Sequence, residues 1–284
     1  MTEMPTIDVL LATYRPDLRF LEAQVESIRR QTGVETNIIS REDVDGTGAA
    51  ANFSALLAES SAQYIAFADQ DDVWLEQKLA KLLDCVKRLE RQYGSDRPIL
   101  AFCDSWVTDR ELKPLPGTFL SRQRLALPKA MALPRLLMQN FIAGNLMLFN
   151  GALRDKAGAV PPGALMHDSW VALVAAAFGV IGQVDEPLLY YRQHGDNTLG
   201  ATAADARHCR RRMAEGPAAF AKRLEANIAQ ARAFCERFGD AAPECVRALA
   251  DFSKLGYWRR RAAILRHGLF KQGLLRNLAL MLWA

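Results

Sequence analysis

Three carboxylates fall within four residues, Asp69-Gln70-Asp71-Asp72, directly after the apolar run Tyr64 to Ala68. A short apolar run of this kind predicts a buried strand, and acids that end such a strand face a cleft at the edge of a sheet. Carboxylates this close repel one another, and a hard divalent cation that bridges the phosphates of a nucleotide would offset the repulsion. The stretch therefore predicts a site for a metal ion and a nucleotide diphosphate.

Apolar strands alternate with amphipathic helices along the first 110 residues, and this order predicts an α/β fold with a parallel sheet and helices on both faces. Ligands of such a fold lie beyond the carboxyl ends of the strands. The predicted strands are Ile7 to Ala12, Thr36 to Ser40, Tyr64 to Ala68, Ile99 to Val107 and Leu146 to Phe149. A first predicted helix begins after Asp17, which can cap it. Two further predicted helices cover Asn52 to Ser60 and Leu75 to Tyr93.

Two further segments have a distinct pattern. Four prolines interrupt residues 113 to 135, which predicts a mobile loop near the site. The uncharged run Ser169 to Val184 is too short to span a bilayer, which takes about 20 apolar residues. We interpret it as a buried helix that ends at Gly179 and a buried strand after it.

Charge divides the chain near residue 200. Residues 201 to 284 contain 16 Lys and Arg against 7 Asp and Glu, a net charge of +9, whereas the first 200 residues have a net charge of −5. We expect a domain over residues 1–200 and a basic helical extension over residues 201–284. The extension ends in aliphatic residues and Trp283, which favours an anionic membrane surface over nucleic acid as its partner.

The five cysteines are odd in number and form no close pair, which indicates a reduced compartment. No basic, apolar and small-residue succession precedes Ile7, so a signal peptide is not expected. Together with the basic extension, these features predict a cytoplasmic protein at the inner face of the plasma membrane.

Four motifs, taken in order, resemble the family 2 inverting glycosyltransferases, which have a GT-A type fold. The closest subgroup is bacterial enzymes of surface polysaccharide synthesis, often described as rhamnosyltransferases. The resemblance covers residues 6 to about 200. The motifs are Leu10-Leu11-Ala12-Thr13-Tyr14, Phe67-Ala68-Asp69-Gln70-Asp71-Asp72-Val73-Trp74 with Lys78-Leu79, His167-Asp168-Ser169-Trp170 and Tyr191-Arg192-Gln193-His194-Gly195-Asp196-Asn197.

The resemblance implies a nucleotide site at the ends of the first two strands. The matching positions are Thr13, Tyr14, Glu42 and Asp43, and Asp43 would accept a hydrogen bond from N3–H of a uracil or thymine ring. The usual pair of aspartates followed by glycine and serine is replaced here by Glu42-Asp43-Val44-Asp45-Gly46, so Asp45 is a second candidate for this contact.

Asp69 and Asp71 match the DxD signature of the family. The resemblance implies that Asp69 contacts the nucleotide sugar, and that Asp71 and Asp72 hold Mg²⁺ or Mn²⁺ against the diphosphate, whose departure the metal assists as a Lewis acid. The alternative is an acidic turn that caps the following helix, and capping by Asp72 is compatible with metal binding.

Asp168 matches the catalytic base, which takes the acceptor proton as the hydroxyl oxygen attacks the anomeric carbon. An N-cap without chemistry is its alternative. His167, beside it, is either a second base or a neighbour that tunes Asp168. His194 is a candidate for a third metal ligand or a diphosphate donor, and Arg192 for binding phosphate oxygens.

We therefore expect an enzyme that transfers a sugar from dTDP-rhamnose or a UDP-hexose to a glycan or lipid-linked glycan, with inversion. Two alternatives belong to other classes. A sugar-phosphate nucleotidyltransferase would need a Gly-rich, basic loop after the first strand, where this chain has Thr13-Tyr14-Arg15-Pro16-Asp17. A non-catalytic subunit of polysaccharide assembly would not need Asp69, Asp71, Asp72 and Asp168 together.

Overall fold

The computed structural model describes residues 4–123, 125, 127, 129–193 and 216–284. Contacts divide the chain into two compact units, which are described separately. The first contains residues 1–120, 142–160 and 166–201, and the second contains residues 121–141, 161–165 and 202–284.

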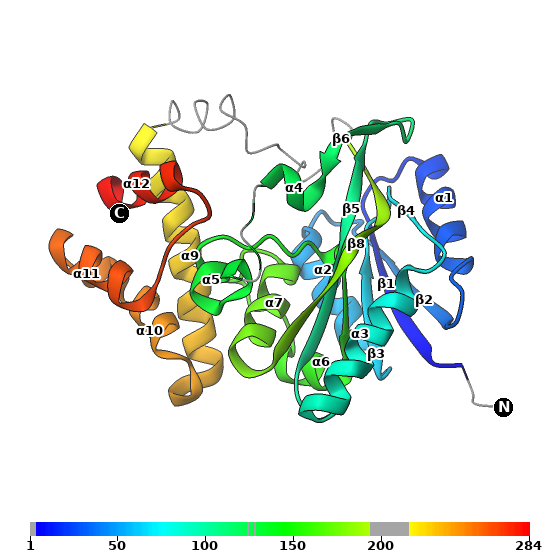
Figure 1. Cartoon of the computed structure of the whole chain (residues 1–284), viewed down its shortest axis with the longest axis horizontal. Helices are drawn as coiled ribbons and strands as arrows, with labels where there is room; N and C mark the ends of the chain where they lie inside the picture. The colour runs from blue at the N-terminus through cyan, green and yellow to red at the C-terminus, as the bar shows by residue number, and fades with distance from the viewer. Residues whose placement is uncertain (1–3, 124, 126, 128, 194–215) are drawn as a thin grey trace. The chain divides into compact units, whose positions relative to one another are not determined.

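An eight-stranded sheet forms the centre of the first unit (Figure 1). β1 pairs in parallel with β2 and β3, and β5 pairs in parallel with β8, whereas β7 is antiparallel to both β3 and β5. β1, β2, β3, β5 and β8 therefore run in one direction, so the predicted mostly parallel sheet is confirmed with β4, β6 and β7 reversed. In spatial order the strands are β2 (Glu35–Glu42), β1 (Thr6–Thr13), β3 (Tyr64–Ala68), β7 (Met147–Asn150), β5 (Ile99–Thr108), β8 (Val180–Arg192) and β4 (Val73–Trp74), with β6 (Pro114–Thr118) paired to β5.

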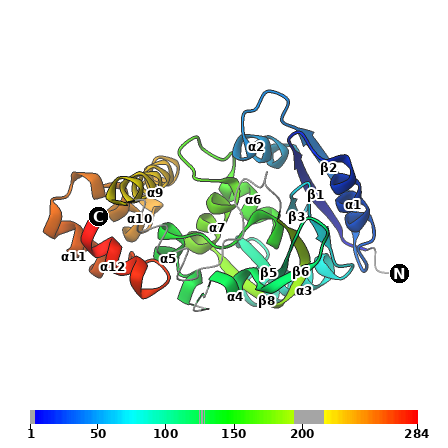
Figure 2. The same cartoon turned by 90° about the horizontal axis from the view of Figure 1, so that it is seen from above.

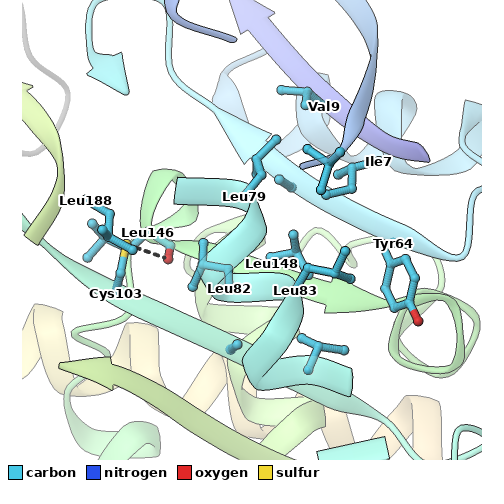
Figure 3. Close-up of a cluster of buried hydrophobic side chains, with 14 of the residues drawn as sticks. Ile7, Val9, Tyr64, Leu79, Leu82, Leu83, Cys103, Leu146, Leu148 and Leu188 are labelled. Carbon is cyan, nitrogen blue, oxygen red and sulfur yellow. Dashed lines mark hydrogen bonds between the residues drawn. The ribbon is translucent and has the colours of Figure 1, made fainter. Parts of the chain in front are cut away.

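Helices cover both faces of the sheet. Alternate strand residues point to opposite sides, so apolar side chains on each face pack against helices. On one face, Val9 lies in one core with Leu79 and Leu82 of α3 (Lys78–Tyr93) (Figure 3). Ala66 and Ile28 of α1 (Leu18–Arg29) belong to the same core. On the other face, the Phe67 ring lies 5.1 Å from that of Phe53 in α2 (Ala49–Glu59) and 5.2 Å from that of Phe149. α6 (Gly151–Ala157) and α7 (His167–Phe178) complete this second layer (Figure 2).

The uncharged run folds as the sequence predicts. The middle of α7 is buried from Ser169 to Ala175, the helix ends at Gly179, and β8 follows at once. A Cβ atom at Gly179 would meet the carbonyl oxygen of Pro98 at 1.8 Å, so only glycine fits where the chain turns back onto the sheet. The predicted cap of α1 is also confirmed, since the Asp17 carboxylate accepts a hydrogen bond from the Arg19 N–H at 3.1 Å.

The prediction of a loop over residues 113 to 135 is wrong for the residues that the structure describes. They contain β6, α4 (Phe119–Gln123), the 3₁₀ turn Lys129–Met131 and the start of α5 (Leu133–Met138). Proline is compatible with these elements, because Pro114 begins an outer strand and Pro134 lies in the first turn of a helix, where a missing N–H costs nothing.

The second unit is helical. α9 (Gly216–Phe238) is its longest helix, and Asn227 and Gln230 on α9 bond to the backbone of Met138 at 3.1 Å and of Leu165 at 3.0 Å. These bonds explain why residues 121–141 and 161–165 group with the carboxyl-terminal helices. Besides α5, the described part of this unit contains α10 (Glu244–Ala250), α11 (Tyr257–His267) and α12 (Leu274–Trp283), with 3₁₀ turns at Gly239–Ala241 and Phe252–Lys254. Within the described ranges, no helix is both long and apolar enough to cross a bilayer.

Candidate functional site

The acidic residues Asp69 to Asp72, the acidic loop, follow β3 and lead into β4. Because β1, β3, β5 and β8 share one direction, their carboxyl ends place Thr13, Asp69, Thr108 and Arg192 at the same edge of the sheet. Asp69 is partly buried and Asp71 keeps 9% of its surface exposed, whereas Asp72 is fully buried. The carboxylates of this loop therefore occupy two different environments.

Asp72 is buried, and both of its carboxylate oxygens accept hydrogen bonds from the protein. Its Oδ2 accepts a hydrogen bond from the Asn145 side-chain amide, and its Oδ1 accepts one from the Arg192 backbone N–H at 3.3 Å. Asn145 belongs to the 3₁₀ turn Gly144–Leu146 that precedes β7, so this carboxylate joins three segments far apart in sequence. With both oxygens occupied and no exposed surface, Asp72 supports the loop; a direct bond from Asp72 to a metal stays a prediction that this geometry does not favour.

Lys78 supplies a positive charge beneath the acidic loop, a role that the sequence does not predict. Its side chain is fully buried at the start of α3, and its ammonium group donates to the Asn145 carbonyl oxygen at 2.7 Å and lies 3.1 Å from the centroid of the Trp74 ring. Burial lowers the pKa of Lys78 to about 7, while the nearby Asp72 and Asp69 act in the opposite direction. A lysine four residues after a Trp at a helix start gives no signal in sequence that it is buried.

Arg192 lies against the acidic loop, and its guanidinium group bonds to the main chain. Nε donates to the Asp71 carbonyl oxygen at 2.8 Å, Nη1 donates to the Arg110 carbonyl oxygen, and the group lies 4.1 Å from the centroid of the Phe20 ring. The residue is only 4% exposed. This geometry gives Arg192 the role of fixing the acidic loop, and a contact with phosphate stays a prediction.

The predicted nucleotide residues of the first strand meet the acidic loop directly. Thr13 is buried at the end of β1, and the next residue, Tyr14, is 47% exposed. The Tyr14 N–H donates to Gln70 Oε1 at 2.7 Å, and Gln70 Nε2 donates back to the Tyr14 carbonyl oxygen at 3.2 Å. Gln70 thus joins the loop after β1 to the loop after β3.

Asp43 shapes the loop after β2 from within. Its carboxylate accepts hydrogen bonds from the backbone N–H groups of Gly48 at 2.7 Å and Thr47 at 2.8 Å, and these bonds hold its pKa below the usual value. Its own N–H donates to the Thr13 carbonyl oxygen at 2.8 Å, which ties this loop to β1. Glu42 and Asp45 are exposed beside it. A base contact by Asp43 stays a prediction, and between the two candidates for it, Asp45 is exposed whereas Asp43 is buried.

Asp168 lies in the first turn of α7, where the helix dipole favours a carboxylate. Its carboxylate accepts hydrogen bonds from the backbone N–H groups of Ser169 and Gly144, but burial outweighs them and raises its pKa to about 6. A carboxyl group with this pKa is ionised at neutral pH and is a stronger base than an exposed aspartate.

Asp168 and the acidic loop form one electrostatic cluster. Burial, the charge of Asp71 and then the charge of Asp168 together raise the pKa of Asp69 to about 7, while the charge of Lys78 opposes them. Carboxylates that interact in this way lie close together. The structure therefore brings the predicted base to the predicted DxD residues, although they are 99 residues apart in the sequence.

His167 is buried between aromatic rings and away from solvent. Its ring stacks on Phe53 with centroids 3.8 Å apart and meets Phe67 edge-on at 4.8 Å, and burial lowers its pKa to about 3. Neither ring nitrogen has a hydrogen-bond partner among the described residues. A neutral imidazole with so low a pKa is a weak base, so the geometry favours packing for His167.

The described residues contain no group of three or more His, Cys, Asp or Glu side chains arranged to hold a metal ion, and His194 lies outside them. This arrangement fits Mg²⁺ or Mn²⁺ all the same, because Mg²⁺ is usually held by one or two carboxylates together with substrate phosphates. Asp69 and Asp71 are the carboxylates available for that purpose.

Trp74, Trp106 and Trp170 differ in exposure. Trp170 is fully buried and its indole N–H donates to the Ala157 carbonyl oxygen at 3.1 Å, and Trp74 is 3% exposed. Trp106, near the carboxyl end of β5, is 38% exposed. Trp106 therefore has by far the largest exposed surface of these three residues.

Comparison with known proteins supports the fold. No family model matches the sequence, and no curated protein matches it. Residues 1–349 of S. aureus TarS in complex with UDP align with 92% of this chain and 88% of that chain, at a TM-score of 0.50 and 11% identity. The same protein in complex with UDP-GlcNAc aligns with 92% of this chain and 89% of that chain, at a TM-score of 0.49 and 12% identity. At these identities the likeness shows a shared fold, and the chain has the expected GT-A type α/β fold with carboxyl-terminal helices.

Proposed function

We propose that the chain is an inverting glycosyltransferase of the family 2 type, which moves a sugar from a nucleotide diphosphate to a hydroxyl group. One observation carries the proposal. The carboxylate of Asp168, at the amino end of α7, accepts a hydrogen bond from the Gly144 N–H, the next residue Asn145 bonds to Asp72 of the acidic loop, and the charge of Asp168 acts on Asp69. A base and a DxD pair at one sheet edge are the two groups that this reaction needs.

The donor would lie along the ends of β1, β2 and β3. Tyr14 and the solvent-facing Asp45 would contact the nucleoside, and Asp69 and Asp71 would face the diphosphate. A bound Mg²⁺ or Mn²⁺ would neutralise the leaving diphosphate. Asp72, Lys78 and Arg192 would keep these carboxylates in place through Asn145 and the backbone of Asp71.

Asp168 would accept the proton of the acceptor hydroxyl. As the acceptor oxygen bonds to the anomeric carbon, the bond from that carbon to the diphosphate oxygen breaks, and the anomeric configuration inverts in this single displacement. The raised pKa of Asp168 makes its carboxylate basic enough to take the proton at neutral pH. Trp106 offers the exposed ring on which the acceptor sugar would stack.

The donor would be a UDP-hexose or dTDP-rhamnose, and the acceptor a lipid-linked or polymeric glycan of the bacterial surface, such as O-antigen, capsule or exopolysaccharide. The shared fold with TarS in complex with UDP supports a uridine nucleotide. The basic carboxyl-terminal helices, with no bilayer-spanning helix among the described residues, support a peripheral position at the inner face of the plasma membrane.

Two variants test the proposal. Asp168→Asn keeps the size of the side chain and removes the proton acceptor, so transfer should fall by about 10²-fold or more while donor affinity is retained. Asp71→Ala should instead abolish the Mn²⁺-dependent binding of UDP or dTDP, which calorimetry with and without chelator would measure. Asp155→Asn is a control, because this exposed carboxylate lies on α6. Wild-type turnover in Asp168→Asn, or UDP and dTDP affinities that do not change with chelator, would refute the assignment.

A further inference from the structure

Four leucines of α12 form one exposed stripe. Leu274, Leu275, Leu278 and Leu282 are 77%, 53%, 51% and 64% exposed. At 3.6 residues per turn they fall within an arc of about 100° on the helix. Leu280 and Ala284, on the opposite side, are buried, so α12 packs on the second unit through one face and leaves the leucine stripe uncovered.

Such a stripe is not ordinary surface. Single exposed leucines are common in globular proteins, but contiguous apolar surface marks a binding face. In the leucine stripe no polar side chain interrupts the arc, because Arg276 and Asn277 lie on the other side of the helix.

The part of the chain that contains the stripe is basic, which favours an anionic partner. After Asp251 the chain has no acidic residue, and residues 257 to 284 contain six Lys and Arg. Arg259 and Arg266 of α11 are exposed, as is Trp258, at 80%. An apolar helix face, joined through Arg261 to a neighbouring helix that carries exposed cationic and Trp side chains, is complementary to the surface of an anionic bilayer, where each basic residue adds attraction.

The fold fixes α12 in place. The guanidinium group of Arg261 is buried and donates to the carbonyl oxygens of Met281 at 3.0 Å, Leu282 at 3.1 Å and Ala284, which satisfies the carboxyl end of the helix. At the other end, Asn277 bonds to both the N–H and the carbonyl of Lys271, at 2.7 and 2.9 Å. The leucine stripe is therefore presented by an anchored helix, and exposed leucines can be changed without loss of core packing.

We propose that the leucine stripe of α12 inserts into the interface of an anionic lipid surface, parallel to the membrane plane. This assigns a face and named residues to the membrane contact within the proposed function. It does not depend on transferase chemistry, because the stripe binds lipid whether or not the enzyme turns over.

The test compares two matched leucines in the full chain. Leu282→Asp places a charge in the stripe, whereas Leu18→Asp makes the same change at a leucine of α1 that is 67% exposed. Sedimentation with phosphatidylcholine vesicles, with and without one third phosphatidylglycerol, measures binding. We expect the wild type and Leu18→Asp to bind the anionic vesicles equally, and Leu282→Asp to bind at least tenfold more weakly. Thermal unfolding of both variants checks that each is folded.

Three results would overturn the inference: recovery of the wild type in the supernatant with anionic vesicles at low salt, equal losses in the two variants, or a wild-type dimer that Leu282→Asp converts to monomer with unchanged vesicle binding. The last result would mean that a second copy of the chain covers the stripe. Transfer to a water-soluble acceptor is measured in parallel. If the wild type does not transfer sugar to this acceptor, the proposed transferase activity is refuted. The vesicle result alone decides the role of the stripe.

Discussion

The side-chain amide of Gln70 forms a closed pair with the backbone of Tyr14, accepting from its N–H at 2.7 Å and donating to its carbonyl oxygen at 3.2 Å. The two residues are 56 positions apart. Gln70 stands between Asp69 and Asp71, so the residue that separates the two DxD carboxylates also positions the exposed Tyr14. The nucleoside and diphosphate parts of the proposed donor site are therefore mechanically joined.

Gln70→Glu should weaken donor binding. Glutamate keeps the acceptor for the Tyr14 N–H but loses the donor, and it faces the Tyr14 carbonyl oxygen with a negative charge. Loss of one hydrogen bond, at about 1 kcal/mol, predicts a Kd for UDP raised several-fold to tenfold, measured by calorimetry with Mn²⁺. Gln63→Glu is the matched control, because Gln63 is exposed just before the amino end of β3. Equal affinities in the wild type and Gln70→Glu would remove the positioning role.

Lys78→Met should destabilise the fold. The change keeps an unbranched chain but removes the hydrogen bond to the Asn145 carbonyl oxygen and a positive charge that interacts with the buried Asp72. Removing one partner of a buried charge pair costs about 3–5 kcal/mol, which urea denaturation would measure.

Two variants sharpen that measurement. Lys81→Met removes a lysine one turn later that is 34% exposed and paired with Glu186 on the surface, and its effect should stay below about 1 kcal/mol. Asp72→Asn in the Lys78→Met background should recover part of the loss, because it removes the uncompensated charge. Additive effects of the two changes would show that Lys78 and Asp72 are not coupled.

The sequence predicts the elements of this fold better than it predicts their polar contacts. Tyr64 to Ala68 is a strand and Gly179 ends α7 as expected, because apolar runs and glycine act locally. The contacts of Lys78 with Asn145 and of Arg192 with Asp71 join residues 67 and 121 positions apart, and no local pattern encodes them. The prolines of residues 113 to 135 predict a loop, but pairing with β5 creates a strand there, and this pairing is also not encoded locally.

His167→Leu should retain transfer and should make the protein less sensitive to acid. The ring of His167 has a pKa of about 3 in the folded protein, against about 6.5 in an unfolded chain. Between these values the unfolded state binds a proton that the native state does not, so the wild type loses stability as pH falls from about 6.5 toward 3, by at most about 1.4 kcal/mol per pH unit. Leucine removes this contribution. Urea denaturation at pH 7 and pH 5 measures the difference, and an equal loss in both proteins, or loss of transfer at pH 7, would contradict the packing role.

Asp168 should set the acid limb of the pH profile. Its carboxylate accepts a proton only when ionised, and burial raises its pKa to about 6, so kcat should fall about tenfold per pH unit below that value. The residual activity of Asp168→Asn should lack this limb. A raised carboxyl pKa also means that the ionised group costs the native state stability as pH rises from about 3.8 through 6, by up to about 3 kcal/mol. Asp168→Asn should therefore be more stable than the wild type at pH 7 and lose that advantage near pH 4. A less active variant with no gain in stability at pH 7 would show that burial does not destabilise the ionised form of Asp168.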